Sequence, residues 1–555
     1  MSAPALDRSP EEGREARGAA RGTRLFDLYA VLAASVVLLA RAAWLWDPYL
    51  VLDDAFISYR YAVHLAYGKG LVWNVGERVE GYTNFLWTAL LAAGARWLDL
   101  PALSRVLALA AGVGTIWLLV RLARAHFVCR PLLVALPALL YAAMGSQARL
   151  AVSGMETLLF VFLLLAAVAL LFAPASGGGR PLAAGLTFAL AVMTRPEGAM
   201  YALLTAAFAL VLGLAPGQPL AERRWRAVRI ASGFAGLYVP YFVARALYYR
   251  ALLPNTYYVK AAGFSWGRLA RGQGLLREEI GLWSLAPILV LALVALPALR
   301  RSRLLLLGAV YAAATAAAFV WVGGDFLPFF GPRFLLPALP LLLLLAAEGV
   351  GRLASLGGSQ LALRRLVTAS LAALLLWNAA WLSWPGRFWR FPALALEMRS
   401  WTELGRWIAA NTPPGTVLAT GGAGIVPFYA RRPAIDYFGL CDAHIARLPP
   451  RPGAWNQPGH EKYDPAYVLA RRPDLIEIGI SREGVPITAG FAAYAGRIAT
   501  CYRLAVLVKN HDGPAADGSF LLETDKWRPE RFDEGYQIVV YARRLGLRAQ
   551  RLCGP

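Results

Sequence analysis

Two adjacent carboxylates, Asp53 and Asp54, lie just beyond the first long apolar segment of the chain. Such groups are costly to hold at a membrane surface unless each is solvated, paired or bound to a cation. A positioned carboxylate can take the proton of an acceptor hydroxyl, which is a poor nucleophile near neutral pH. The pair therefore predicts an acidic catalytic site, and a divalent cation held by Asp53 and Asp54 stays open as an alternative.

The residues that follow the two aspartates are of types that bind sugars. Aromatic rings offer platforms for a sugar, and polar side chains can contact its hydroxyl groups. The sequence offers Trp73, Asn74, Glu80 and Tyr82 for this purpose, with Glu80 as a second acidic group. The alternative is an interfacial loop with aromatic belt residues and ordinary surface charges.

Cations at the membrane surface are candidates for binding a phosphate group. The sequence places Lys260, Arg333 and Arg195 next to apolar segments. Each has a plainer interpretation, because Lys260 can snorkel to the interface, Arg195 can pair with Glu197, and Arg333 can pair with Asp325.

Further polar residues at the ends of apolar segments or in the C-terminal region are candidates for sugar or acceptor contacts. They are Glu156, Glu197, Asn255, Tyr257, Asp325, His444, His460 and Glu461. Metal binding by the last three is an alternative, although their spacing matches no standard zinc pattern. The glycines at 421–424 match a nucleotide fingerprint poorly.

Long apolar runs must position these residues. The chain has 555 residues, of which 58% are hydrophobic and 16% charged, whereas soluble domains carry roughly 25% charged residues. The net charge of +22 comes mostly from arginines that punctuate apolar runs, which is typical of cytoplasmic loops rather than of a nucleic-acid partner. We predict eleven spanning helices, at 26–47, 101–122, 130–146, 157–174, 181–194, 199–215, 230–248, 282–299, 304–322, 334–351 and 366–384.

The segment 84–98 decides the orientation of the chain. If it lies in the interface, the arginine clusters fall on the cytoplasmic side, as the positive-inside rule requires. Residues 48–100 then form an external loop of the core 25–384, which follows a disordered cytosolic tail at 1–24. The stretch 385–555 alternates β-rich and helix-like runs, which predicts an external α/β domain. We expect the N-terminus in the cytosol and the C-terminal domain in the periplasm, at a bacterial cytoplasmic membrane.

Several short motifs occur in an order typical of one superfamily. They are Asp53–Ile57, Gly70–Asn74, Glu77–Thr83, Ser153–Thr157, Thr194–Gly198, Pro254–Tyr258, Gly323–Phe326 and Gly459–Lys462. The ordered set resembles the GT-C glycosyltransferases, and more closely the terminal β-(1→2) arabinofuranosyltransferases of actinobacterial cell walls. The resemblance implies a helical membrane core with interfacial helices in the first external loop, capped by an α/β domain.

The resemblance also implies an activity. The donor would be a polyprenyl-phosphate sugar, with arabinofuranose as the sugar, and the acceptor an envelope glycan, glycolipid or glycoprotein. Asp53 would be the base and Asp54 would support it, although the two roles could be exchanged. The alternatives are a transferase of the same fold for another lipid-linked sugar (mannose or aminoarabinose), a transporter or flippase, and a non-enzymatic membrane binding protein.

Overall fold

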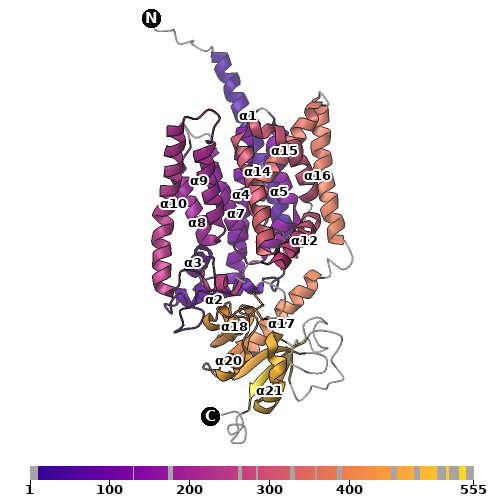
Figure 1. The fold of residues 1–555 in the computed structure, drawn as a ribbon. Coiled ribbons are helices and arrows are strands. Elements are labelled where there is room, and N and C mark those ends of the chain that lie inside the picture. Colours follow the sequence, from indigo (N-terminus) through magenta and orange to yellow (C-terminus); the bar gives the residue numbers. More distant parts are fainter. Residues whose placement is uncertain are drawn as a thin grey trace.

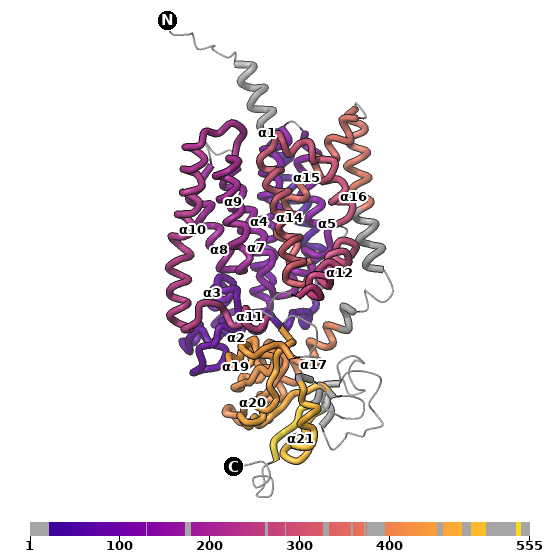
Figure 2. Tube along the Cα trace, in the orientation of Figure 1, coloured from indigo at the N-terminus to yellow at the C-terminus, as the bar shows by residue number. Residues whose placement is uncertain are grey.

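The structure is a computed structural model, and it describes residues 10–128, 130–172, 179–260, 265–282, 285–325, 332–356, 359–383, 390–451, 459–480, 488–508, 521–523 and 537–544. A body of long helices carries a smaller domain with a β-sheet at one end (Figure 1). Helix α1 extends to the end of the body opposite the sheet domain (Figure 2).

The body is built from apolar helices packed around one large core. Its helices are α1 (Pro10–Trp44), α4 (Leu100–His126), α5 (Pro131–Ala143), α6 (Gly145–Val152), α7 (Thr157–Phe172), α8 (Pro181–Thr194), α9 (Gly198–Val211), α10 (Leu220–Tyr249), α12 (Trp266–Leu282), α13 (Leu285–Val294), η1 (Leu296–Arg300), α14 (Arg303–Val322), η3 (Leu336–Ala338), α15 (Leu339–Leu356) and α16 (Gln360–Ser383).

Many of these helices have the length and composition of membrane spans. Among the described residues five are long and apolar enough to cross a bilayer, or six if the bent pair α5 and α6 counts as one span. Five shorter apolar helices of 10–17 residues accompany them. The chain is a multi-pass membrane protein.

Three boundaries differ from those expected from the sequence. Helix α1 begins at Pro10, inside the expected disordered tail, because a proline in the first turn followed by Glu11 and Glu12 favours a helix start. Helix α10 begins at Leu220, so the arginines at 223–229 lie on a helix rather than in a loop. The connection between the expected spans 130–146 and 157–174 contains a helix, α6, because the chain bends by 53° after α5 and continues as a helix.

Three short helices form a layer between the body and the sheet domain: α2 (Asp53–Ala66), α3 (Phe85–Gly94) and α11 (Asn255–Lys260). Figure 1 shows α2 and α3 at the end of the body that faces the sheet. A helix of the 10 residues in α3 is about 15 Å long, which is too short to cross the hydrocarbon. This agrees with an interfacial position for the segment 84–98.

The C-terminal domain is a mixed sheet with helices. It contains α17 (Arg390–Asn411), β1 (Leu418–Thr420), α18 (Ile425–Ala430), β2 (Ala434–Asp436), α19 (Ala443–Ala446), α20 (Pro465–Ala470), β3 (Leu475–Ile480), η4 (Thr488–Tyr494), α21 (Ala495–Cys501), β4 (Tyr502–Val508), β5 (Leu521–Glu523) and β6 (Gln537–Arg543). The strand order is β2-β1-β3-β6-β4-β5. Strands β2, β1 and β3 are parallel and the other pairings are antiparallel.

The two faces of this sheet bury different cores, as the alternation of side chains along a strand requires. Leu418 and Leu475 point into a core shared with the α2 region, which also holds Tyr61 and Trp73. The next residue in β1, Ala419, points into a core that lies on the other face. The sheet domain is thus packed onto the first loop through an apolar interface.

Candidate functional site

A cavity of about 120 Å³ lies where the body meets the sheet domain, and we name it the junction cavity. Segments far apart in the sequence meet there: α2, the stretch before α3, the turn after α6, the α8–α9 connection, α11 and the stretch before α15. It is lined by Asp54, Ile57, Ser58, Gly81, Tyr82, Thr83, Asn84, Met155, Glu156, Arg195, Glu197, Thr256, Lys260, Arg333, Phe334 and Leu440.

Asp54 is the member of the aspartate pair that faces this cavity. Its side chain is 43% exposed, and its carboxylate lies 3.8 Å from the guanidinium of Arg333. Arg333 is held in place by Asp325, with Nε 2.6 Å and Nη2 2.9 Å from the two carboxylate oxygens. Burial alone lowers the pKa of Arg333, but Asp325 and Asp54 outweigh this effect and raise it.

Asp53 points away from the cavity and binds the sheet domain. Its carboxylate accepts hydrogen bonds from the backbone N–H groups of Gly424 (3.2 Å) and Ile425 (2.6 Å) at the start of α18. A Cβ atom at Gly424 would lie 1.8 Å from the carbonyl oxygen of Asp53, so only glycine permits this approach. Within the glycine-rich stretch 421–424, it is thus Gly424 that accommodates Asp53, whereas Gly421 lies against Tyr437.

The pKa of the Asp53 carboxyl is raised to about 7, chiefly because the group is shielded from water; the carboxylates of Asp54 and Asp436 add to this increase, and the two amide hydrogen bonds oppose it. Two other buried acids of the sheet domain behave similarly. Burial raises the pKa of Asp436 to about 6 and that of Glu477 to about 7. Three buried acids in this part of the molecule thus gain protons more readily than ordinary carboxyl groups.

A chain of charged contacts forms a further part of the lining of the junction cavity. Arg195 Nη1 lies 3.0 Å from Glu156, and Arg195 Nε lies 2.5 Å from Glu197. Asn84 donates a 2.8 Å hydrogen bond to the second oxygen of Glu156. Glu156 is buried and Glu197 is partly open to the cavity, so one guanidinium links two carboxylates of different exposure.

Lys260 is the third cation of the cavity. Loss of water around its ammonium group lowers its pKa, and nearby Arg333 and Arg195 lower it further while Asp54 and Asp325 oppose the change. Within the described parts of the chain Lys260 makes no ion pair, unlike Arg333 and Arg195. It is therefore the cation of this cavity that is most available to a ligand.

Three of the residues predicted to bind sugar lie outside the cavity and join the loop to the sheet domain. Trp73 donates its indole N–H to the carbonyl oxygen of Ala423 at 3.1 Å. Asn74 forms two hydrogen bonds with the backbone of Ala434 in β2, at 2.8 and 3.1 Å. Asn255 donates to the carbonyl oxygens of a turn in the sheet domain, at 2.8 to 3.2 Å.

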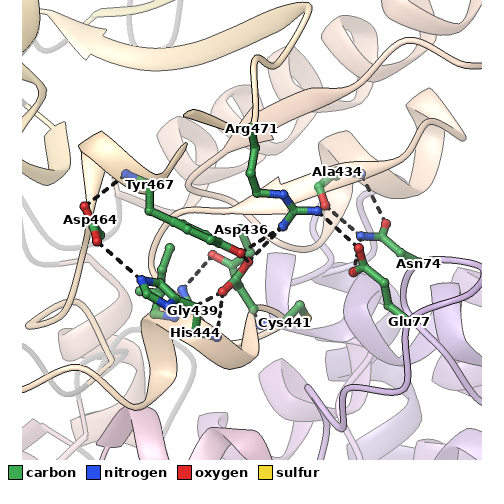
Figure 3. Close-up of polar contacts among 12 residues, drawn as sticks. Asn74, Glu77, Ala434, Asp436, Gly439, Cys441, His444, Asp464, Tyr467 and Arg471 are labelled. Carbon is green, nitrogen blue, oxygen red and sulfur yellow. Dashed lines mark hydrogen bonds and ion pairs between the residues drawn. The ribbon is translucent and has the colours of Figure 1, made fainter. Parts of the chain in front are cut away.

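Figure 3 shows how this junction continues on the surface. Arg471 of the sheet domain contacts Asp442 at 3.1 Å and Glu77 of the first loop at 3.2 Å. His444 stacks on Tyr467 with ring centres 4.1 Å apart, and its Nε2 lies 3.3 Å from Asp464. These positions place His444 in a surface network of the domain, away from the junction cavity.

The remaining predicted residues are distributed as follows. Tyr82 lines the cavity, whereas Glu80 is buried against Arg245, with contacts of 2.7 to 2.9 Å. Tyr257 is 54% exposed. Two further predicted residues make contacts outside the cavity: the His460 ring is 4.7 Å from that of Phe438, and Glu461 lies 3.8 Å from Arg268.

Two residues were not selected from the sequence and hold the site together. Asn84 lines the cavity, accepts a hydrogen bond from Ser58 (3.0 Å) and positions Glu156. Arg60 is buried in α2 and donates to the carbonyl oxygens of Trp73 (2.7 Å) and Arg432 (2.8 Å). Two sequence features could have identified these residues. Asn84 lies two positions after Tyr82, and Arg60 is a charged residue within an otherwise apolar helical stretch.

The described residues contain no cluster of three or more His, Cys, Asp and Glu side chains that could hold a metal ion. The divalent cation at Asp53 and Asp54 stays a prediction, and the two carboxylates point to different partners. Cys441 is a buried free thiol, whereas Cys501 is disulfide-bonded.

Sequence comparison finds two matches. Residues 393–537, in the sheet domain, match a family described as "Domain of unknown function (DUF8728)". A stretch of 248 residues is 32% identical to the "Terminal beta-(1->2)-arabinofuranosyltransferase" of Mycobacterium tuberculosis, over 40% of this chain and 37% of that relative. The chain thus matches about a third of the length of this curated relative.

Similar solved structures cover almost the whole chain. ArnT from Cupriavidus metallidurans matches in a structure bound to undecaprenyl phosphate, with a TM-score of 0.56, 14% identity and coverage of 91% of this chain and 97% of ArnT. Its apo structure gives a TM-score of 0.57 at 16% identity, over 94% and 98% of the two chains. The chain has the GT-C fold.

A second relative with the GT-C fold is the archaeal oligosaccharyltransferase AglB from Archaeoglobus fulgidus, in complex with an inhibitory peptide and a dolichol-phosphate. The TM-score is 0.55 at 13% identity, over 95% of this chain and 77% of AglB. The GT-C architecture expected from the sequence, a helical core with a C-terminal α/β domain, is confirmed.

Proposed function

We propose that this protein is a membrane glycosyltransferase that transfers a sugar from a polyprenyl-phosphate donor to an acceptor in the cell envelope. The observation that carries the proposal is that Asp54 shares one cavity with Lys260, Arg333 and Arg195. The reaction needs a proton acceptor beside a cationic site for the leaving phosphate. The relative from Mycobacterium tuberculosis and the lipid phosphates bound by ArnT and AglB support this assignment.

Asp54 is the general base in this proposal. It takes the proton of the acceptor hydroxyl while that oxygen bonds to the anomeric carbon of the sugar. The bond between the anomeric carbon and the phosphate oxygen breaks, and its electron pair leaves on the polyprenyl phosphate. Asp54 is supported over Asp53 for this role because it faces the cavity, whereas the carboxylate of Asp53 accepts two backbone hydrogen bonds.

Asp53 acts as a positioning residue. It fixes the start of α18 against the first turn of α2, and α2 carries Asp54 one residue further on. Any movement of the sheet domain is thus transmitted to the helix that holds the base. This assignment exchanges the two roles that the family resemblance first suggested.

Lys260 makes the first contact with the donor phosphate, and Arg333 and Arg195 add to the positive potential. Both arginines are held by carboxylates, so their geometry is set before the donor binds, as transition-state stabilisation requires. Glu156, Glu197, Tyr82 and Asn84 line the rest of the cavity and contact the sugar or the acceptor. The acceptor enters beneath the sheet domain, near Leu440.

The donor sugar we propose is D-arabinofuranose, which the name of the Mycobacterium tuberculosis relative supports. The acceptor is an envelope glycan, glycolipid or glycoprotein. The match to nearly the full length of ArnT favours one alternative, a transferase of this fold that uses another lipid-linked sugar. The arginine-rich end of the body faces the cytosol of a bacterium, and the junction cavity and sheet domain face the periplasm.

A donor panel tests this function. Purified full-length protein is given polyprenyl-phosphoryl arabinofuranose, mannose or aminoarabinose with a crude envelope acceptor, and polyprenyl phosphate release is measured. We expect release with the arabinofuranose donor, and in Lys260→Gln a KM for this donor raised roughly tenfold or more. Tyr257→Phe is the matched control, since this exposed side chain lies outside the cavity. Folded protein that releases no polyprenyl phosphate from any donor contradicts the proposal.

A further inference from the structure

A second cavity of about 220 Å³ lies at the end of the helical body opposite the sheet domain, and we name it the far cavity. The ends of α4 and α7, the α9–α10 loop and the start of α14 form it. Figure 1 shows the α9–α10 loop at the end of the body away from the sheet. The lining residues are Ala125, His126, Phe172, Leu214, Ala215, Pro216, Arg301, Ser302, Arg303 and Leu304.

The polar lining of the far cavity is cationic. Arg301 and Arg303 contribute two permanent positive charges, and no carboxylate is among the described residues that line the cavity. Glu348 lies 3.3 Å from His126, which lines the cavity, and also contacts Arg352. Within the described residues neither Arg301 nor Arg303 forms an ion pair, so both guanidinium groups are available to an anion.

Arg303 carries a buried donor that lacks a partner. Its Nε atom is shielded from solvent and has no hydrogen-bond acceptor among the described residues. A buried donor left unsatisfied costs about 1–3 kcal/mol, and such groups are rare in folded proteins. A guanidinium donates through its Nε and Nη atoms in a planar fork that matches two oxygens of a phosphate.

The start of α14 adds to the attraction for an anion. Ser302 caps the helix by accepting from the N–H of Leu305 at 3.3 Å. The N-terminus of this 20-residue helix presents its positive end to the cavity, which favours a negatively charged ligand. The other walls, at Phe172, Leu214 and Leu304, are apolar.

We propose that the far cavity binds a phosphate group, and its apolar walls at the ends of membrane helices point to a phospholipid headgroup as the source. Basic pockets between spanning helices bind anionic headgroups in this way. The phosphate oxygens accept from the buried Nε of Arg303 and from Arg301. Such a lipid holds α4, α7 and α14 together at the end of the body that the sheet domain does not reach.

Native mass spectrometry of the full-length protein in a neutral detergent tests this site. The probes are dioleoyl phosphatidic acid and dioleoyl phosphatidylcholine, in which the choline cation offsets the phosphate. We expect wild type to retain one molecule of phosphatidic acid in preference. The double variant Arg301→Gln/Arg303→Gln binds this molecule at least about tenfold more weakly, because two charge-assisted hydrogen-bonding groups are lost.

Matched variants separate the site from general charge effects. Arg300→Gln removes the same charge from the neighbouring residue, which does not line the cavity, and it keeps the preference. Arg301→Lys/Arg303→Lys retains the charges and keeps most of the binding, which rules out misfolding as the cause. Lys260→Gln, in the junction cavity, leaves this lipid bound.

Three results decide the matter. Unchanged binding in the double glutamine variant, or an equal loss in Arg300→Gln, overturns the site. Displacement of phosphatidic acid by millimolar inorganic phosphate supports the phosphate site but overturns the lipid source. Retention of phosphatidic acid in the presence of that phosphate supports both.

Discussion

The two cavities at the ends of the helical body differ in how their charges are balanced. The junction cavity is lined by three carboxylates and three cations, with Asp325 behind Arg333 as a further acid. Among the described residues, the far cavity is lined by two arginines and a histidine and by no carboxylate. Ion pairs hold side chains in a fixed geometry but weaken their attraction for a bound anion. The paired charges of the junction cavity therefore suit a reaction, and the arginines of the far cavity, unpaired among the described residues, suit retention of an anion.

The cavities also differ in the parts of the chain that build them. The far cavity consists of helix ends and one loop of the body. The junction cavity depends on α2, whose first turn is bound to the sheet domain through Asp53. Changes in the domain interface should therefore affect the junction cavity and leave the far cavity intact.

The largest expected effect comes from removing Arg333, which contacts Asp54 of the junction cavity and Asp325 behind it. Arg333→Gln removes the guanidinium that contacts the buried carboxylate of Asp325, and breaking such a buried ion pair costs about 3–5 kcal/mol of stability. It also removes positive charge near the leaving phosphate, so we expect turnover to fall on the order of 100-fold. Thermal unfolding and polyprenyl phosphate release measure the two losses.

Arg303→Gln is the matched change in the far cavity. We expect turnover to change by no more than about twofold, as for a substitution remote from the reacting groups. Equal losses in Arg333→Gln and Arg303→Gln would contradict the division of roles between the two cavities.

A smaller effect is expected from the domain interface. Gly424→Ala places a Cβ atom 1.8 Å from the carbonyl oxygen of Asp53, and such overpacking costs about 1–3 kcal/mol. We expect faster limited proteolysis of the sheet domain and lower turnover, with phosphatidic acid binding at the far cavity unchanged. Gly415→Ala is the control, because a Cβ atom there meets nothing within 4 Å; an equal effect of both substitutions would argue against the close approach at Asp53.

The smallest expected effect is a dependence of folding stability on pH, caused by acidic groups at and near the interface with the sheet domain. Burial raises the pKa of Asp53 to about 7, whereas an unfolded aspartate is ionised above about pH 4. Between these values the folded state binds more protons, so stability falls as the pH rises through 7. From pH 6 to 8 the loss due to Asp53 is about 1 kcal/mol, and Glu477, with a pKa raised to about 7, adds to it.

Thermal unfolding across this pH range checks the sign. Asp53→Asn should flatten the curve in part, because it removes one of the titrating groups. A midpoint that rises from pH 6 to 8 would contradict the buried, proton-binding state of these acids.

Much of the fold could be predicted because long apolar runs in the sequence identify membrane helices. The apolar runs at 304–322 and 157–174 correspond to α14 and α7 with small shifts at the ends. The β-rich and helix-like runs expected after residue 385 correspond to the strands and helices of the sheet domain, β3 and β6 among them. The bend between α5 and α6 was missed, because local sequence does not report a change of direction inside a continuous apolar stretch.

The site was predictable only in part, because local sequence patterns do not indicate which distant segments come into contact. Residue types indicated Asp54, Glu156, Arg195, Lys260 and Arg333, which the structure brings into one cavity. Trp73 and Asn74 have the types expected of sugar contacts, yet they bind the backbone of the sheet domain.

The division of roles between Asp53 and Asp54 shows the same limit. Successive residues of a helix point about 100° apart, so one of the two must face the cavity and the other must face elsewhere. Which one does so depends on the docking of α18, more than 350 residues later in the chain. Sequence alone therefore left the two roles exchangeable.

The most direct test of the account compares Asp54→Asn with Asp53→Asn in single-turnover release of polyprenyl phosphate, using protein of verified folding. The account predicts a loss of at least about 100-fold for Asp54→Asn, the range of a lost general base. It predicts a loss below about tenfold for Asp53→Asn, because the amide oxygen can still accept one hydrogen bond from α18. A larger loss in Asp53→Asn than in Asp54→Asn, or no loss in either, would contradict it.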